Sequence, residues 1–256
     1  MIRNVSCRLR RVSYFFIHVR FLSVTIKEKP KESIKMRKFK KTNPSVSIGF
    51  FAAFALWTIA VRFLDVQSIG PKHSAVGLAG INGAVRECIG SNMTLYTITD
   101  WLGILPLCFV FGFGILGLVQ WIRRKNIVKV DYDILVLGAF YVAVMAAYLL
   151  FEIVVVNYRP VLINGYLEAS YPSSTTMLVL CVMPTASLQF KRRIKNKTLK
   201  IWVLAAIQIF IIFMVAGRLV SGVHWFSDII GGILLSAGFV TAYHSLAYKK
   251  VDKLNR

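Results

Sequence analysis

The chain is hydrophobic and strongly basic. It has 256 residues, of which 56% are apolar and 17% are charged, and its mean hydropathy is +0.62. These values exclude an ordinary water-soluble domain and predict an integral membrane protein. The net charge of +21 must then lie outside the hydrocarbon, where a charge is expensive. A disulfide scaffold and a zinc site are also excluded, because the cysteines lack paired spacing: Cys7, Cys88, Cys108 and Cys181.

Residues 1–44 are predicted to form a basic arm without a spanning helix. The apolar run at 13–20 is too short to cross a bilayer, and 28–41 is almost continuous charge. A signal peptide fits poorly, because His18 and Arg20 interrupt the apolar run. Two interpretations stay open: a cytoplasmic interfacial arm, or a start placed too early, with Met36 as the natural first residue.

Six apolar stretches follow, each near the length of about 20 residues that crosses about 30 Å of hydrocarbon. They cover 46–63, 102–122, 134–156, 173–190, 201–219 and 226–247. The predicted fold is an all-α integral membrane protein, a bundle of six transmembrane helices over residues 45–247, with a basic tail at 248–256.

The basic residues predict the orientation of this bundle. Of the 32 Lys and Arg, 27 lie in the arm, the connections 123–129 and 191–200, and the tail. The other five are Arg62, Lys72, Arg86, Arg159 and Arg218. By the positive-inside rule, both termini are predicted to be cytoplasmic in a multi-pass protein of the cell membrane.

Ionisable residues gather at the predicted outer ends of the spans, and each is a functional candidate because charges are costly there. They are Glu152, Arg159, Arg218, His224 and Asp228. None lies at a midplane, where a transporter carries its binding groups, so a transporter is the least favoured function. A cluster at one surface suits an interfacial substrate.

The segment 217–228 carries the clearest chemistry. His224 and Asp228 are four residues apart, so on a helix they share a face, and Asp228 can accept from one imidazole nitrogen while the other stays free. A nucleophilic histidine is held in this way. Arg218 can turn back across Ser221-Gly222 and bind a phosphoryl oxygen. The alternative is a structural His-Asp pair at a helix start.

Two further segments reach the same predicted surface. Arg159-Pro160 ends the third span, and Pro172, Ser173 and Ser174 begin the fourth, where the free N–H groups of a helix N-terminus bind anions. Taken alone, Arg159 is an interfacial cation and the Ser-Thr run is a helix cap.

Together and in this order, these segments resemble the type 2 phosphatidic acid phosphatase superfamily, the lipid phosphate phosphatases. The family pattern is Lys-x6-Arg-Pro, then Pro-Ser-Gly-His, then Ser-Arg-x5-His-x3-Asp. The third motif matches at Arg218, His224 and Asp228, with Gly217 in place of serine. Arg159-Pro160 match part of the first motif and Pro172-Ser173 part of the second.

The resemblance implies a membrane phosphatase with its site at the outer face. It implies that His224 is a nucleophile that forms a phosphohistidine, and that Asp228 orients it. Arg159 and Arg218 would bind the phosphoryl group, with Ser173 and Ser174 at the helix start. No metal or other cofactor is expected.

Two departures from the family pattern bear on catalysis. Glu152 stands where the family has lysine, and Thr175 stands where it has a second histidine, which is thought to handle the proton of the leaving group. Glu152 and Arg159 are seven residues, or two helical turns, apart, so we expect them to face the same way on one helix. A carboxyl at that place could be partly buried and protonated, and Glu152 could then replace the missing acid. Lys72 could instead supply the lost positive charge and His73 the lost imidazole, although the simpler and favoured interpretation is that both are solvent-exposed loop residues.

The expected function is hydrolysis of a lipid phosphate or a lipid diphosphate such as a polyprenyl diphosphate. The alternative is a catalytically weakened or non-catalytic member that binds phosphate lipids. The expected partners are the substrate and membrane lipids, and not nucleic acid. The sequence leaves the head group, the lipid chain and the oligomeric state open.

Overall fold

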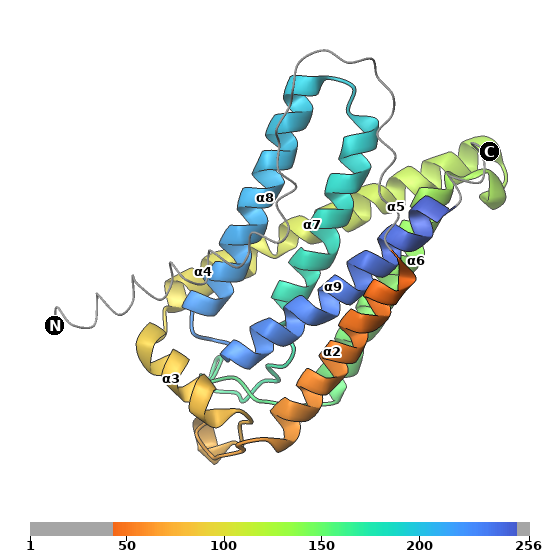
Figure 1. Ribbon diagram of the computed structural model, residues 1–256. Coiled ribbons are helices and arrows are strands. Elements are labelled where there is room, and N and C mark those ends of the chain that lie inside the picture. Colours follow the sequence, from red (N-terminus) through yellow and green to blue (C-terminus); the bar gives the residue numbers. More distant parts are fainter. Residues whose placement is uncertain (1–42, 250–256) are drawn as a thin grey trace, which may run out of the picture. The chain divides into compact units, whose positions relative to one another are not determined.

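The computed structural model describes residues 43–249, which fold as a helical bundle (Figure 1). The helices are α2 (Pro44–Phe63), α3 (Ala79–Ile89), α4 (Met93–Leu102), α5 (Ile104–Arg124), α6 (Tyr132–Ile153), α7 (Ser174–Arg193), α8 (Lys197–Val220) and α9 (Phe226–Lys249), with 3-10 turns η2 (Pro71–His73) and η3 (Ile127–Lys129). Within 43–249 there are isolated β-bridges but no strand. The all-α prediction is confirmed. The predicted arm and tail lie, apart from their few residues nearest the bundle, outside the described residues.

Five helical stretches in the described range are long and apolar enough to cross a membrane: α2, α4 with α5, α6, α8, and α9 to Ala247. The chain is therefore a multi-pass membrane protein. α7 does not reach that hydropathy, because it carries several polar residues and a basic last turn. Its neighbours bury much of it, and a helix shielded from lipid does not need an apolar surface. The count of six spans stays a prediction.

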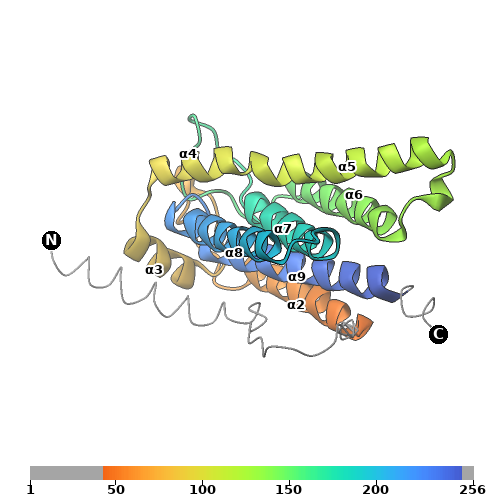
Figure 2. The same cartoon turned by 90° about the horizontal axis from the view of Figure 1, so that it is seen from above.

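α9 forms the centre of the bundle and packs against α2, α6 and α7. Figure 2 shows α4 and α5 along one side of the described bundle and α2 along the other. α2 approaches α9 closely at Gly238, where an added Cβ would lie 2.8 Å from the ring of Phe51. Beside this contact, the ring of Phe54 packs edge-on against that of Phe151 at 5.6 Å and lies parallel to that of Tyr171 at 6.2 Å.

One end of the bundle gathers the start of α7, the end of α8 and the start of α9, with α3 and α4 beside them (lower part of Figure 1). Two side chains fix the start of α9 there. Trp57 of α2 donates to the carbonyl of Ser227 at 3.0 Å, and Asn82 of α3 donates to the hydroxyl of Ser227 at 2.9 Å. This end is rigidly tied to both α2 and α3.

The opposite end holds the two predicted cytoplasmic connections. Asp133, at the start of α6, accepts from Arg192 at 3.2 Å and from Arg193 at 3.3 Å. Arg124 pairs with Asp131 at 2.9 Å. Connections 123–129 and 191–200 therefore lie at one end of the bundle, as their charge predicts.

Candidate active site

His224 lies in the turn between α8 and α9, held by the main chain of Ser170. Its Nδ1 lies 3.1 Å from the Ser170 carbonyl oxygen. A carbonyl can only accept, so Nδ1 carries the proton and donates it. The Nε2 atom is buried and has no hydrogen-bond partner in the described part of the chain. Its lone pair is therefore free to attack an electrophile.

Asp228 lies near His224 and Ser170 but forms no hydrogen bond with His224. Its Oδ2 is 3.8 Å from His224 Nδ1, beyond a hydrogen bond, and accepts from the main-chain N–H of Trp225 at 2.8 Å and from the Ser170 hydroxyl. The expected placement of both residues on one helical face is wrong, because α9 begins at Phe226. Asp228 therefore bonds to Ser170, the residue that holds His224, rather than to His224 itself.

The electrostatic surroundings favour a neutral His224. Its side chain is 1% exposed. Burial lowers the pKa of His224 well below 6.5, and the positive charges of Arg159 and Arg218 lower it further. A neutral imidazole is the form that can act as a nucleophile.

Because the pKa of His224 is lowered, kcat/KM is expected to be maintained as the solution becomes mildly acidic. As pH falls through 6.5, this imidazole stays neutral, so the acid limb of kcat/KM is expected below pH 6.5. The measurement is a pH profile of kcat/KM on a lipid diphosphate, corrected for the separately titrated substrate. An acid limb at or above pH 6.5, once corrected, would contradict the assignment.

A hairpin-like loop after α6 brings Arg159 to this histidine. The N–H of Arg159 donates to the carbonyl of Glu168 at 3.0 Å, and that of Ser170 to Asn157 at 2.9 Å. The same loop therefore carries Arg159 and the residue that holds His224. The Arg159 side chain is mostly buried, with Nε 3.1 Å from the carboxylate of Glu168 and with Nη1 unpartnered in the described structure.

Arg218 reaches the site from the last turn of α8 and is held by one face of α4. Its Nη1 donates to Thr99 Oγ1 and Asp100 Oδ1, each at 3.4 Å, and its guanidinium carbon lies 5.1 Å from the centre of the Tyr96 ring. An added Cβ on Gly217 would lie 2.7 Å from Thr99 Cγ2. This close approach of α8 to α4 accounts for glycine where the family pattern has serine.

The start of α7 completes the site. Ser173 is the N-cap residue, and its N–H donates to the carbonyl of Asp228 at 3.1 Å. The Ser173 side chain accepts no N–H of the first turn, which Ser174, Thr175 and Thr176 form. Those groups have no intrahelical partner, so the positive end of α7 is available to an anion.

Several buried atoms of these site residues have no hydrogen-bond partner among the described residues. Arg159 Nη1, Arg218 Nε and the Ser173 hydroxyl are donors, while His224 Nε2 and Asp228 Oδ1 are acceptors. Buried polar atoms are rarely left unpaired in folded proteins, so such a group marks a place for a ligand. The two guanidinium groups among them are suited to an anion with several oxygen atoms.

The sequence-predicted substitutes for the missing histidine do not join this group of donors. Lys72 and His73 are exposed in η2. Glu152 is exposed in the last turn of α6, which ends at Ile153, and Arg159 lies beyond it in the loop. The expectation that Glu152 and Arg159 face the same way on one helix is wrong. Thr175, in the first turn of α7, is partly exposed.

Sequence reasoning missed Ser170 and the α4 residues that hold Arg218. Ser170 holds His224 through its main-chain carbonyl, which every residue type has, so its identity carried little signal. Tyr96, Thr99 and Asp100 have the spacing of one helical face. That spacing was the available signal, inside a segment interpreted as an outer connection.

Two of the comparisons with known proteins found a similarity, and both lead to one superfamily. The sequence model of the PAP2 superfamily matches residues 136–252. The fold is similar to the crystal structure of a transmembrane PAP2 type phosphatidylglycerolphosphate phosphatase from Bacillus subtilis, with a TM-score of 0.54 and 17% identity, over 82% of this chain and 98% of that chain. No curated protein matches the sequence. The match spans the loop of Arg159, the start of α7 and the turn of His224, so the segment that holds these residues is similar to the PAP2 superfamily.

Proposed function

We propose that this protein is a membrane phosphatase that hydrolyses a lipid phosphate or lipid diphosphate through a phosphohistidine on His224. The observation that carries the proposal is the His224 imidazole, which is buried, has Nε2 unpartnered in the described structure, and lies beside Arg159 and Arg218. A protein that only binds a phosphate lipid needs the arginines but has no need of an oriented imidazole.

In the first step, His224 Nε2 attacks the phosphorus atom, and the bond from phosphorus to the leaving oxygen breaks. That oxygen departs with the bonding electron pair. Arg159, Arg218 and the start of α7 balance the charge on the phosphoryl oxygens. The Nδ1 proton stays on His224, stabilised by the Ser170 carbonyl at 3.1 Å and by the nearby Asp228 carboxylate.

In the second step, water attacks the phosphohistidine, the bond from phosphorus to Nε2 breaks, and inorganic phosphate leaves. The electron pair of that bond returns to Nε2, which restores the neutral imidazole. The proton lost by the water passes to solvent or to a phosphate oxygen.

The test is phosphate release by the purified protein from a panel of lipid monophosphates and diphosphates. Acid-labile phosphate retained on the protein during turnover is the expected second signal. A protein that binds these lipids without releasing phosphate would instead be the non-catalytic member considered above.

We further propose that the site faces the outside of the cell membrane, with both termini cytoplasmic, as the split of basic residues predicts. In a background without native cysteines, Lys72→Cys is expected to react with an impermeant thiol reagent in intact cells. Lys125→Cys, in the connection between α5 and α6, is the matched control and is expected to react only after lysis. The reverse pattern would invert the topology.

A further inference from the structure

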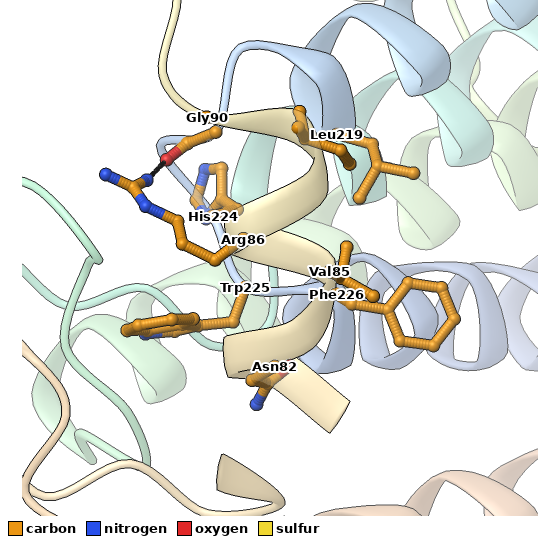
Figure 3. A pocket seen from close by; sticks show the side chains of 10 residues that line it. Asn82, Val85, Arg86, Gly90, Leu219, His224, Trp225 and Phe226 are labelled. Carbon is orange, nitrogen blue, oxygen red and sulfur yellow. Dashed lines mark hydrogen bonds between the residues drawn. The ribbon is translucent and has the colours of Figure 1, made fainter. Parts of the chain in front are cut away.

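A pocket lies between α3 and the turn that carries His224 (Figure 3). The pocket is partly open to solvent, and the space that its walls enclose has room for about one water molecule. Apolar side chains from α3, α8 and α9 line much of it: Val85, Ile89, Leu219 and Phe226. His224 and Arg86 also line it, so one pocket combines the candidate nucleophile, a cation and an apolar wall.

Arg86 is fixed in this pocket by its bond to the turn. Its Nη1 donates to the carbonyl of Gly222, two residues before His224. The turn and the end of α3 approach so closely that an added Cβ on Gly222 would lie 2.0 Å from the carbonyl oxygen of Gly90. Gly222 also has a φ of +67°, which favours glycine. Arg86 is therefore held beside His224, as Figure 3 shows.

The guanidinium of Arg86 has capacity left for a ligand. It carries five N–H donors in a planar fork, and the Gly222 carbonyl takes one of them. Arg86 is only partly exposed, and of the residues that line the pocket it is the one with a permanent positive charge. Half-buried guanidinium groups with open donors are suited to phosphate.

The family pattern has a third cation that this chain lacks at the usual place. Glu152 stands at the position of the family lysine, and its side chain is exposed. Lys72, the substitute that the sequence offered, is exposed in η2. Arg86 comes from α3, outside the residues 136–252 that match the superfamily, and lines the same pocket as His224.

We propose that Arg86 is a third cationic ligand of the substrate, and that it binds the second phosphate of a lipid diphosphate, the one attached to the lipid. This rests on the proposed function. Arg159 and Arg218 bind the terminal phosphoryl group, and Arg86 and apolar side chains line one pocket together with His224. A lipid diphosphate offers a terminal phosphate, an inner phosphate and a hydrocarbon chain to these three kinds of side chain. When the terminal group moves to His224, the inner phosphate gains negative charge, which Arg86 stabilises.

Binding of inorganic pyrophosphate and inorganic phosphate to the purified protein in detergent tests this assignment. Arg86→Gln is expected to weaken pyrophosphate binding about tenfold or more, the worth of a charge-assisted contact, and to change phosphate binding much less. Arg86→Lys keeps the charge, so its affinity for pyrophosphate is expected to lie between those of the wild type and Arg86→Gln. Arg62→Gln removes an exposed charge at the end of α2 and is the matched control.

The ratio of the two affinities is the decisive readout, because partial unfolding lowers both affinities together and leaves their ratio unchanged. An unchanged ratio in Arg86→Gln would overturn the role of Arg86, even if the wild type hydrolyses lipid diphosphates. A changed ratio would support the role of Arg86 in binding. If the wild type nevertheless released no phosphate from any lipid, that result would contradict the proposed function and not the role of Arg86.

Discussion

Replacing His224 by alanine is expected to lower phosphate release by at least about 10³-fold, the scale at which covalent enzymes lose activity without their nucleophile. The acid-labile phosphate on the protein should disappear as well, because no other described side chain presents an unpartnered imidazole nitrogen to Arg159 and Arg218. The measurement is a single-turnover assay with labelled substrate, with phosphate release followed in parallel.

Two variants control for a folding defect in this experiment. His224→Asn keeps an N–H that can donate to the Ser170 carbonyl, so it should fold as the wild type does and still be inactive. His244→Ala removes an imidazole about 27 Å further along α9 and should remain active. Comparable phosphate release by His224→Ala and the wild type would rule out the phosphohistidine mechanism.

The substitution Thr175→His is expected to raise activity selectively on a lipid monophosphate. Expelling an alkoxide calls for a proton, and an acid at that point is worth typically about 10² to 10⁴ in rate. A threonine hydroxyl cannot supply that proton near pH 7. A lipid diphosphate expels a phosphate monoester, which is stable as an anion because its second ionisation falls near about pH 6. The wild type is therefore expected to prefer the diphosphate.

The comparison uses wild type and Thr175→His on a lipid monophosphate and a lipid diphosphate that share one lipid chain. Ser174→His, one residue earlier in the same helical turn, is the matched control, because it adds the same imidazole in another direction. A wild type already faster on the monophosphate would mean that another acid acts here, and Glu152→Gln and His73→Ala would then test the two candidates.

The order of the segments in the chain predicted much of the site. Long apolar runs predict helices whatever their neighbours are, because a span must satisfy its own backbone in lipid. The loop after the third run, the start of the fourth and the turn before the last then had to meet at one end of an antiparallel bundle. Arg159, Ser173, Arg218 and His224 meet there in the structure.

The contacts that hold the catalytic groups were decided by tertiary structure. The sequence suggested that Asp228 binds His224 directly, but a loop carbonyl takes that place at 3.1 Å, and a main-chain contact has no side-chain signature. The prediction that Glu152 and Arg159 share one helix was wrong because α6 ends at Ile153. The main chain after it forms hydrogen bonds across the loop instead, from Arg159 to Glu168 and from Ser170 to Asn157.

The same distinction holds for the segment between α2 and α5. Its composition predicted an outer connection, because α3 and α4 are each too short to be predicted as membrane spans from the sequence. Only packing against the ends of α8 and α9 decides that Tyr96 and Asp100 hold Arg218, and that Arg86 lies beside His224. The sequence by itself predicted the long apolar helices and the candidate site residues, because both follow from local composition and spacing. The tertiary structure decided their partners, because these come from segments distant in the chain: Ser170 is 54 residues from His224, and Asp100 is 118 residues from Arg218.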